Sequence, residues 1–280
     1  MLNKISFGAA LPYMEIRHDK NPKRSLVLTN KSFEFEPGLN MLVGANGSGK
    51  STLLEAIAKR FLCFNFGTPN LDKETFGYMS ELWEKDEEWS WRDEKFLPYV
   101  DVVAEPIPYT MYASPEFTPM GQPNRAYAMC YGLGKIATEY YDKVDSHSSG
   151  QGMSNVLASM FEILRGAERP IGRRQVEKHE WRDERDSGKK QVNWLDQNIL
   201  PKSDAPVTLL LDEPERALDL NAQLKFWADL TEFSKQPNVQ IIIATHSIIP
   251  MFMPDIKVNY VEMTDGYADS LTQGVRKLSK

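Results

Sequence analysis

Two short segments of this chain carry residue types that together can bind a triphosphate. The first, residues 44–51, has a glycine, four further residues, then Gly49, Lys50 and Ser51, which is the phosphate-loop pattern. The second, residues 209–214, is an apolar run that leads into the adjacent carboxylates of Asp212 and Glu213. More than half of the chain separates the two segments, so the fold must bring them together for the chemistry to work.

The first segment has the setting that a phosphate loop requires. An apolar strand is predicted at 39–43, and apolar residues recur at helical spacing from 53 to 61. In such a loop the backbone N–H groups point at the phosphates, and so does the start of the next helix. Lys50 reaches the β- and γ-phosphates, and Ser51 binds Mg²⁺. The residues predicted to contact the nucleotide here are Gly44, Asn46, Gly47, Ser48, Gly49, Lys50, Ser51 and Thr52.

The second segment predicts a strand buried on both faces. Val207 to Leu211 is mostly apolar and lies between two prolines, which is typical of a central parallel strand with Asp212 at its carboxyl end, where ligands bind in α/β sheets. Asp212 would hold the magnesium ion, and Glu213 would position and polarise an attacking water. Taken alone, two carboxylates after a run of leucines are equally consistent with an ordinary exit from a strand.

Composition limits the class of protein. The chain has 280 residues, 41% of them apolar, and a formal net charge of −6, which argues against a general basic surface for nucleic acid but leaves a local basic groove open. Cys63 and Cys130 have no metal-ligand spacing. No run approaches the roughly 20 apolar residues of a membrane helix, and the start lacks a signal-peptide pattern. We therefore expect a cytoplasmic protein without membrane insertion of its own.

Periodicity and turn residues predict the remaining elements. Short strands at 2–7, 24–29 and 32–35 predict an antiparallel entry to the fold. Further elements are predicted as strands at 100–104, 108–113, 207–211, 239–244 and 257–263, and as helices at 126–141, 153–164 and 221–234. The charged segments at 62–109 and 165–193 favour solvated helices or excursions, and a partner-docking surface is the alternative for the first of them.

Five motifs occur in an order that resembles the ATP-binding-cassette (ABC) ATPases over about residues 30–250. They are the Walker A loop at 44–51, a signature at 148–151, the Walker B strand with a catalytic glutamate at 209–213, a D-loop at 217–219 and a switch histidine in 241–247. The chain most resembles the soluble, single-cassette bacterial "predicted ATPases", which are AAA-domain, SMC-like phosphate-loop ATPases, in its Asp-Glu-Pro-Glu box and its Ala-Thr-His-Ser strand end.

The resemblance implies an α/β fold of the ABC type. Its features would be a central, mostly parallel sheet flanked by helices, an antiparallel N-terminal β subdomain and a helical signature subdomain. One domain would occupy 1–280, with lobe I at about 1–112 and 204–280 and a helical lobe at about 113–203.

The resemblance also implies roles for particular residues. Glu213, His246 and Lys50 would be catalytic, His246 by contacting the γ-phosphate, and Asp219 would communicate across a dimer. The signature residues Ser148, Gly150 and Gln151 would bind ATP held by a second copy of the chain. Physical reasoning supports the signature, because a Ser/Gly-rich turn at a helix start is an anion site. A histidine considered alone is more often a satisfied core residue.

Two departures from the family pattern affect these expectations. Ser149 stands where many cassettes have a glycine, so a Cβ lies where a phosphate must approach. The glutamine-loop residue, a further Mg²⁺ ligand, would be Glu116 by resemblance to the soluble group, and Gln122 is its rival. Tyr13 lies in the region expected to contact adenine, but an aromatic residue there is also consistent with packing.

ATP and Mg²⁺ are therefore the expected ligands, and hydrolysis to ADP and phosphate the expected activity. The first hypothesis is a homodimeric switch or motor in DNA maintenance or phage defence, working beside a protein effector, with nucleic-acid binding left open. The alternative is the energy subunit of a membrane ABC transporter; a phosphoryl-transfer kinase would need neither the signature nor Asp219. The prolines between residues 98 and 123 exclude a long coiled-coil arm.

Overall fold

The computed structural model describes residues 1–8, 27–61, 64–65, 100–114, 149–169 and 201–278. Several sequence predictions lie outside these residues. They are the helix at 126–141, most of the two charged segments, and the residues Tyr13, Cys63, Glu116, Gln122, Cys130 and Ser148.

A parallel sheet forms the centre of the fold and confirms the predicted fold class. Its six strands follow the order β4-β6-β7-β8-β3-β9, and each pairs in parallel with its neighbours. The strands are β3 (Gly38–Val43), β4 (Phe64–Asn65), β6 (Tyr109–Ala113), β7 (Val207–Asp212), β8 (Val239–Ala244) and β9 (Val258–Glu262). Because the strands run the same way, the loops that follow β3, β7 and β8 emerge at one edge of the sheet.

Alternating side chains of the central strands face two separate apolar clusters. Leu209 and Leu211 of β7 face one cluster with Ile241 of β8, whereas Leu210 and Ile242 face the other. Every residue of β3, β7 and β8 is buried. Helices must therefore cover both faces, as the near-continuous apolar runs of these strands predict.

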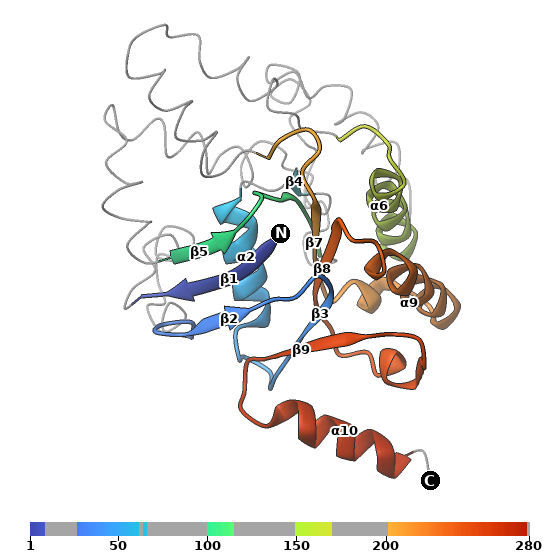
Figure 1. Cartoon of the computed structure of the whole chain (residues 1–280). Coiled ribbons are helices and arrows are strands. Elements are labelled where there is room, and N and C mark those ends of the chain that lie inside the picture. The colour runs from blue at the N-terminus through green and yellow to red at the C-terminus, as the bar shows by residue number, and fades with distance from the viewer. Residues whose placement is uncertain (9–26, 62–63, 66–99, 115–148, 170–200, 279–280) are drawn as a thin grey trace, which may run out of the picture.

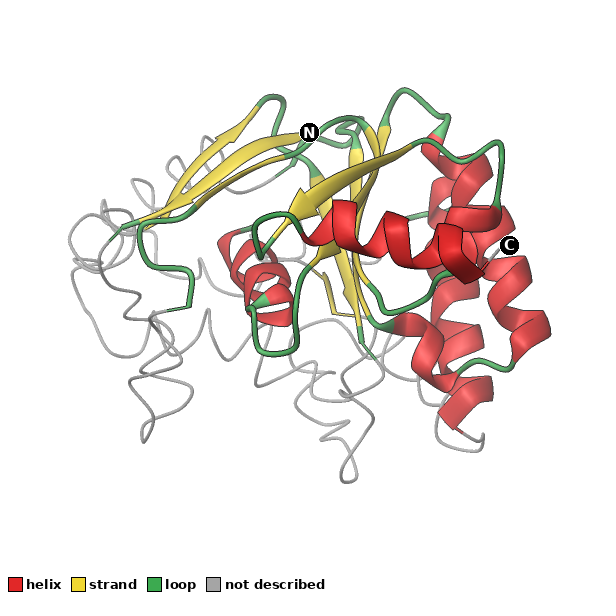
Figure 2. Ribbon diagram, turned by 90° about the horizontal axis from the view of Figure 1, so that it is seen from below, coloured by secondary structure: helices red, strands yellow, loops and turns green. Residues whose placement is uncertain are grey.

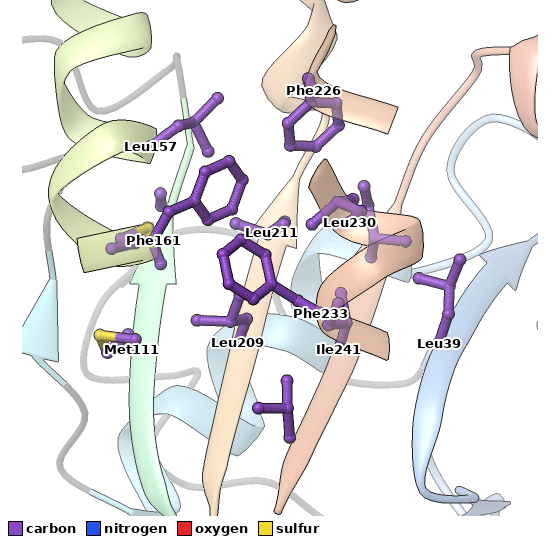
Figure 3. Close-up of a cluster of buried hydrophobic side chains, with 14 of the residues drawn as sticks. Leu39, Met111, Leu157, Phe161, Leu209, Leu211, Phe226, Leu230, Phe233 and Ile241 are labelled. Carbon is purple, nitrogen blue, oxygen red and sulfur yellow. The ribbon is translucent and has the colours of Figure 1, made fainter. Parts of the chain in front are cut away.

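Among the described residues, two helices cover the first face. They are α6 (Ser149–Leu164) and α9 (Leu220–Ser234), and their aromatic side chains fill the space above the sheet (Figure 3). The rings of Phe161 in α6 and Phe233 in α9 lie 5.0 Å apart between centroids. Packing of these aromatic residues holds α6 against α9.

The other face carries α2 (Lys50–Arg60) and an antiparallel sheet of order β2-β1-β5 (Figure 1). The strands are β1 (Leu2–Phe7), β2 (Ser32–Glu34) and β5 (Val100–Ala104). Leu53, Leu54 and Ile57 of α2 are fully buried in the cluster that also contains Leu2 and Ile5 of β1. The helix that follows the phosphate loop is thus enclosed between two sheets.

The strand predicted at 24–29 is wrong for its described residues. Residues 27–30 form a turn, closed by a hydrogen bond of 3.1 Å from the Lys31 N–H to the Leu28 carbonyl oxygen, with Asn30 at a left-handed φ of 56°. The turn buries the side chain of Leu28 in the core. An apolar residue at this position therefore indicates burial and not strand pairing. β5 is the third strand of the antiparallel sheet.

A buried glutamine joins the two sheets. Gln240 of β8 is fully buried, and its amide donates to the carbonyl oxygens of Leu2 and Glu36 at 2.8 and 3.0 Å. Its carbonyl oxygen accepts from the Leu2 N–H and the Thr208 hydroxyl, both at 3.1 Å. These hydrogen bonds attach the N-terminal strand β1 to the amino end of the central strand β8, which is the opposite end of the parallel sheet from the phosphate loop.

The sequence analysis did not predict the last helix, α10 (Tyr267–Leu278), which lies beside β9 (Figure 2). The Glu262 carboxylate accepts from the N–H groups of Gly266 and Ala268 at 2.9 and 2.7 Å and so satisfies the start of the helix. Tyr267 and Leu271, four residues apart, pack against the core and could have indicated this helix. Two 3₁₀ turns, η5 (Pro214–Ala217) and η6 (Ile249–Phe252), were also not predicted.

Candidate nucleotide site

The loop at residues 44–49 connects β3 to α2 with the backbone shape that its glycines allow. Gly47 and Gly49 have left-handed φ angles of 76° and 98°. A Cβ on Gly49 would lie 2.4 Å from Cγ1 of Val27, so the turn described above leaves no room for a side chain. Asn46 and Gly47 are exposed at the tip of the loop, and Thr52 is partly buried in the first turn of α2. This is the local geometry that the phosphate-loop motif predicts.

Lys50 is buried at the base of this loop. It is 7% exposed, and its ammonium donates to the carbonyl oxygens of Gly44 and Ala45 at 3.0 and 3.3 Å. Burial lowers the pKa of Lys50, and the charges of Glu213 and Asp212 partly oppose that shift. The lysine of the first motif therefore lies in the electrostatic field of both acids of the second.

Ser51 and Asp212 meet although they lie 161 positions apart in the sequence. The Ser51 hydroxyl donates to Oδ1 of Asp212 at 3.0 Å, and the Tyr112 hydroxyl lies 3.5 Å from Oδ2. A hydroxyl and a carboxylate are hard oxygen ligands of the kind that Mg²⁺ takes together with phosphate oxygens and water. Within the described residues, no group of three or more His, Cys, Asp and Glu side chains could hold a metal alone. The pair fits a magnesium ion that is shared with a triphosphate.

Glu213 faces His246, the predicted switch histidine. The two side chains come from the ends of neighbouring strands β7 and β8, and Oε1 of Glu213 lies 3.2 Å from Nε2 of His246. Oε2 of Glu213 forms an ion pair of 3.2 Å with Arg216. Glu213 has a left-handed backbone, with φ 45° and ψ 47°, which is uncommon for a residue with a side chain and often marks functional sites.

Glu215 is a site residue to which the sequence analysis gave no role. Its carboxylate is 6% exposed, and Oε1 accepts from the Thr245 hydroxyl at 2.6 Å and from the His246 N–H at 2.9 Å. The sequence did point to this residue, because Glu215 is the last residue of the Asp-Glu-Pro-Glu box. The sequence alone could not show that its partners lie 30 residues further along the chain.

The start of α6, the predicted signature helix, contacts Ala217 in the predicted D-loop segment. α6 begins at Ser149, and a Cβ on Gly150 would lie 2.5 Å from the carbonyl oxygen of Ala217. Gly150 is thus needed for this close packing, whatever else it binds. Asp219 caps α9 by accepting from the Ala222 N–H at 2.9 Å, which gives it a structural role beside the predicted one. Gln151 is exposed on the first turn of α6.

The structure therefore brings Lys50, Ser51, Asp212, Glu213 and His246 to one edge of the parallel sheet. Gly150 and Gln151 lie at the start of α6, on the side of the fold where Asp219 begins α9. The loop, the strand order and these contacts define an α/β protein of the phosphate-loop type.

A comparison with protein families agrees with this class. The profile of a family described as "AAA domain" matches residues 24–87, which include the phosphate loop and α2. This match covers less than half of the chain, and with the motifs described above it supports an ABC/AAA-type phosphate-loop ATPase. A comparison with curated protein sequences finds no match.

Among solved structures, the chain is similar to one titled "crystal structure of a nucleotide-free ATP-binding cassette from an ABC transporter". The identity is 12%, the alignment covers 94% of this chain and 88% of that one, and the TM-score is 0.37. Separately, none of the helices among the described residues is long and apolar enough to span a bilayer.

Proposed function

We propose that this chain is an ATPase that binds Mg-ATP at the phosphate loop and hydrolyses it to ADP and phosphate. The contact between the Ser51 hydroxyl and the Asp212 carboxylate, 3.0 Å long, carries the proposal. It unites the two motifs that a magnesium triphosphate requires at the carboxyl edge of a parallel sheet. Bound Mg²⁺ would be held by these two residues and would neutralise charge on the phosphates.

Glu213 is the residue proposed to act on the attacking water. Its side chain is 21% exposed, so water can reach it, and its contacts with His246 and Arg216 restrain the carboxylate. A carboxylate in this position can accept a hydrogen bond from water and orient it toward the γ-phosphate. His246, 49% exposed, has room to contact that phosphate as well. Lys50 supplies positive charge where the transferred group develops negative charge.

The signature is proposed to act in trans. In this chain Gly150 packs on Ala217 of the D-loop segment, and Gln151 is exposed at the helix start. An exposed helix start can bind the phosphates of a nucleotide that a second copy holds, because the helix dipole is positive at that end. The proposed active form is accordingly a homodimer that closes on ATP.

The central experiment compares two variants with the wild type. Glu213→Gln keeps the size of the side chain but removes the carboxylate, so we expect intact ATP binding, turnover reduced roughly 100-fold or more, and accumulation of the dimer with ATP bound. Lys50→Ala should weaken nucleotide binding itself. Wild-type turnover in Glu213→Gln, or unchanged ATP affinity in Lys50→Ala, would contradict the assignment.

For the biological role, we propose a nucleotide-driven switch or motor in DNA maintenance or phage defence, with a protein effector. The Asp-Glu-Pro-Glu box supports this role, because it resembles the soluble group more than transporters. The test is to purify the chain without detergent and measure its ATPase rate with and without short duplex DNA. Stimulation by DNA supports the switch, and stable co-purification with a membrane protein instead supports a transporter subunit.

A further inference from the structure

We propose that Glu215 is a positioning residue that fixes the switch histidine against Glu213. The inference rests on the proposed ATPase function and assigns a role to a residue outside the predicted catalytic set. Glu215 lies in the 3₁₀ turn η5, directly after the Walker B strand, and its carboxylate bonds to the end of the neighbouring strand β8. It therefore connects the segment that carries Glu213 to the segment that carries His246.

Glu215 restrains the backbone of residues 245–247, which we call the switch segment. Its Oε1 accepts two hydrogen bonds, one from the hydroxyl of Thr245 and one from the N–H of His246. The second bond holds the main chain of the residue whose imidazole contacts Glu213. Hydrogen bonds to a buried charged acceptor are among the stronger ones in proteins, so these bonds restrict where the imidazole can lie.

Glu215 itself is poorly placed to act on water. Glu215 is buried, whereas Glu213 is partly exposed. One oxygen of Glu215 is occupied by two donors, and the other, Oε2, is buried without a hydrogen-bond partner among the residues that the structure describes. A buried carboxylate is costly unless its bonds repay the loss of hydration. The bonds to the switch segment are the ones available to repay it.

Further hydrogen bonds hold the switch segment in place. The Thr245 hydroxyl accepts from the Ser247 N–H at 2.9 Å, and the Ser247 hydroxyl in turn accepts from the indole N–H of Trp227 at 3.2 Å. Trp227 is fully buried in α9, so the switch segment is anchored to a rigid helix.

At the other end of η5, the Ala217 carbonyl lies against Gly150 of the signature helix. One short turn thus contacts both the signature helix and, through Glu215, the switch histidine. A shift of the signature helix would be passed to His246 and Glu213 of the same chain.

The test uses two substitutions at Glu215 in the full-length chain. Glu215→Met keeps a similar volume but leaves the two donors without an acceptor, and we expect kcat to fall about 10- to 100-fold while the Kd for ATP changes less than about threefold. Glu215→Gln keeps one acceptor oxygen and should restore most of the lost kcat. Thr208→Val is the control for stability, because it removes a buried hydrogen bond to Gln240 at the far end of β7. It should lower the melting temperature without lowering kcat.

A double variant separates positioning from general destabilisation. If Glu215 acts through the switch histidine, Glu215→Met should reduce kcat little further in a His246→Ala background. Unchanged kcat in Glu215→Met, or multiplied losses in the double variant, would overturn the proposal. A crystal structure of Glu215→Met gives a readout that does not depend on turnover. Displacement of the imidazole from Glu213 supports the proposal, and retention of the 3.2 Å contact overturns it, even if the wild type proves not to hydrolyse ATP.

Discussion

Substitution of Gly150 by alanine tests whether the signature helix and the D-loop segment pack as closely as the structure shows. In most helices this change is favourable, because alanine loses less backbone entropy than glycine, by roughly 0.5–1 kcal/mol. At Gly150 the new Cβ would lie 2.5 Å from the carbonyl oxygen of Ala217. No real Cβ contact is that short, and the obstacle is backbone, so α6 or the turn must move.

The expected magnitude follows from these two opposing effects. Overpacking of a tight contact costs about 1–3 kcal/mol, which exceeds the gain from helix propensity. We therefore expect Gly150→Ala to lower the free energy of unfolding by about 1–2 kcal/mol, or several degrees in melting temperature. The displaced turn carries Glu215, so kcat should fall as well.

Gly274 provides a matched control. It lies inside α10 (Tyr267–Leu278), and beyond the backbone of its own helix a Cβ there would meet no atom of the described residues within 4 Å. Gly274→Ala should raise the free energy of unfolding by roughly 0.5–1 kcal/mol, because only the helix propensity changes. Thermal unfolding followed by circular dichroism measures both variants in one buffer. If Gly150→Ala is stabilised as much as Gly274→Ala, α6 does not pack against Ala217 as described.

Three further predictions address the site and its support. Ser51→Ala removes the hydroxyl that contacts Asp212, and it should raise the Mg²⁺ concentration for half-maximal ATPase activity about tenfold or more. An unchanged magnesium titration would refute the role of Ser51. Gln240→Leu leaves buried partners unsatisfied and should destabilise the fold by about 2–4 kcal/mol with nucleotide affinity retained; an unaltered melting temperature would contradict this. The pKa of Lys50 is lowered by burial, and a bound triphosphate favours the charged ammonium. Nucleotide binding should therefore take up protons increasingly as the pH rises toward the lowered pKa of Lys50, and calorimetry in buffers of different ionisation enthalpy should detect this uptake.

Local chemistry explains why much of the fold could be predicted. The apolar runs at 39–43, 207–211 and 239–244 are found as β3, β7 and β8, with bounds that differ by at most one residue. Such strands are buried on both faces, so their composition is nearly independent of what surrounds them. The strand predicted at 24–29 was wrong for a related reason. Leu28 is apolar because it is buried in the core, but it lies in a turn and not in a strand.

Amphipathic pattern alone was less informative at the end of the chain. Tyr267 and Leu271 pack against the core, but polar and glycine residues separate the apolar positions of α10, so the helix was missed. Its start depends on Glu262, whose carboxylate satisfies two N–H groups across the preceding turn. Capping of this kind is visible only once the turn geometry is known.

The sequence by itself determined the chemistry of the phosphate loop, since glycine spacing, Lys50 and Ser51 act within one short segment. It also placed Asp212 and Glu213 at the end of a buried strand. Only the tertiary structure decided that Ser51 touches Asp212, that His246 touches Glu213, and that Glu215 holds the switch segment. The physical reason is that parallel pairing of β7 with β8 brings distant strand ends together, and the register of that pairing depends on the whole core.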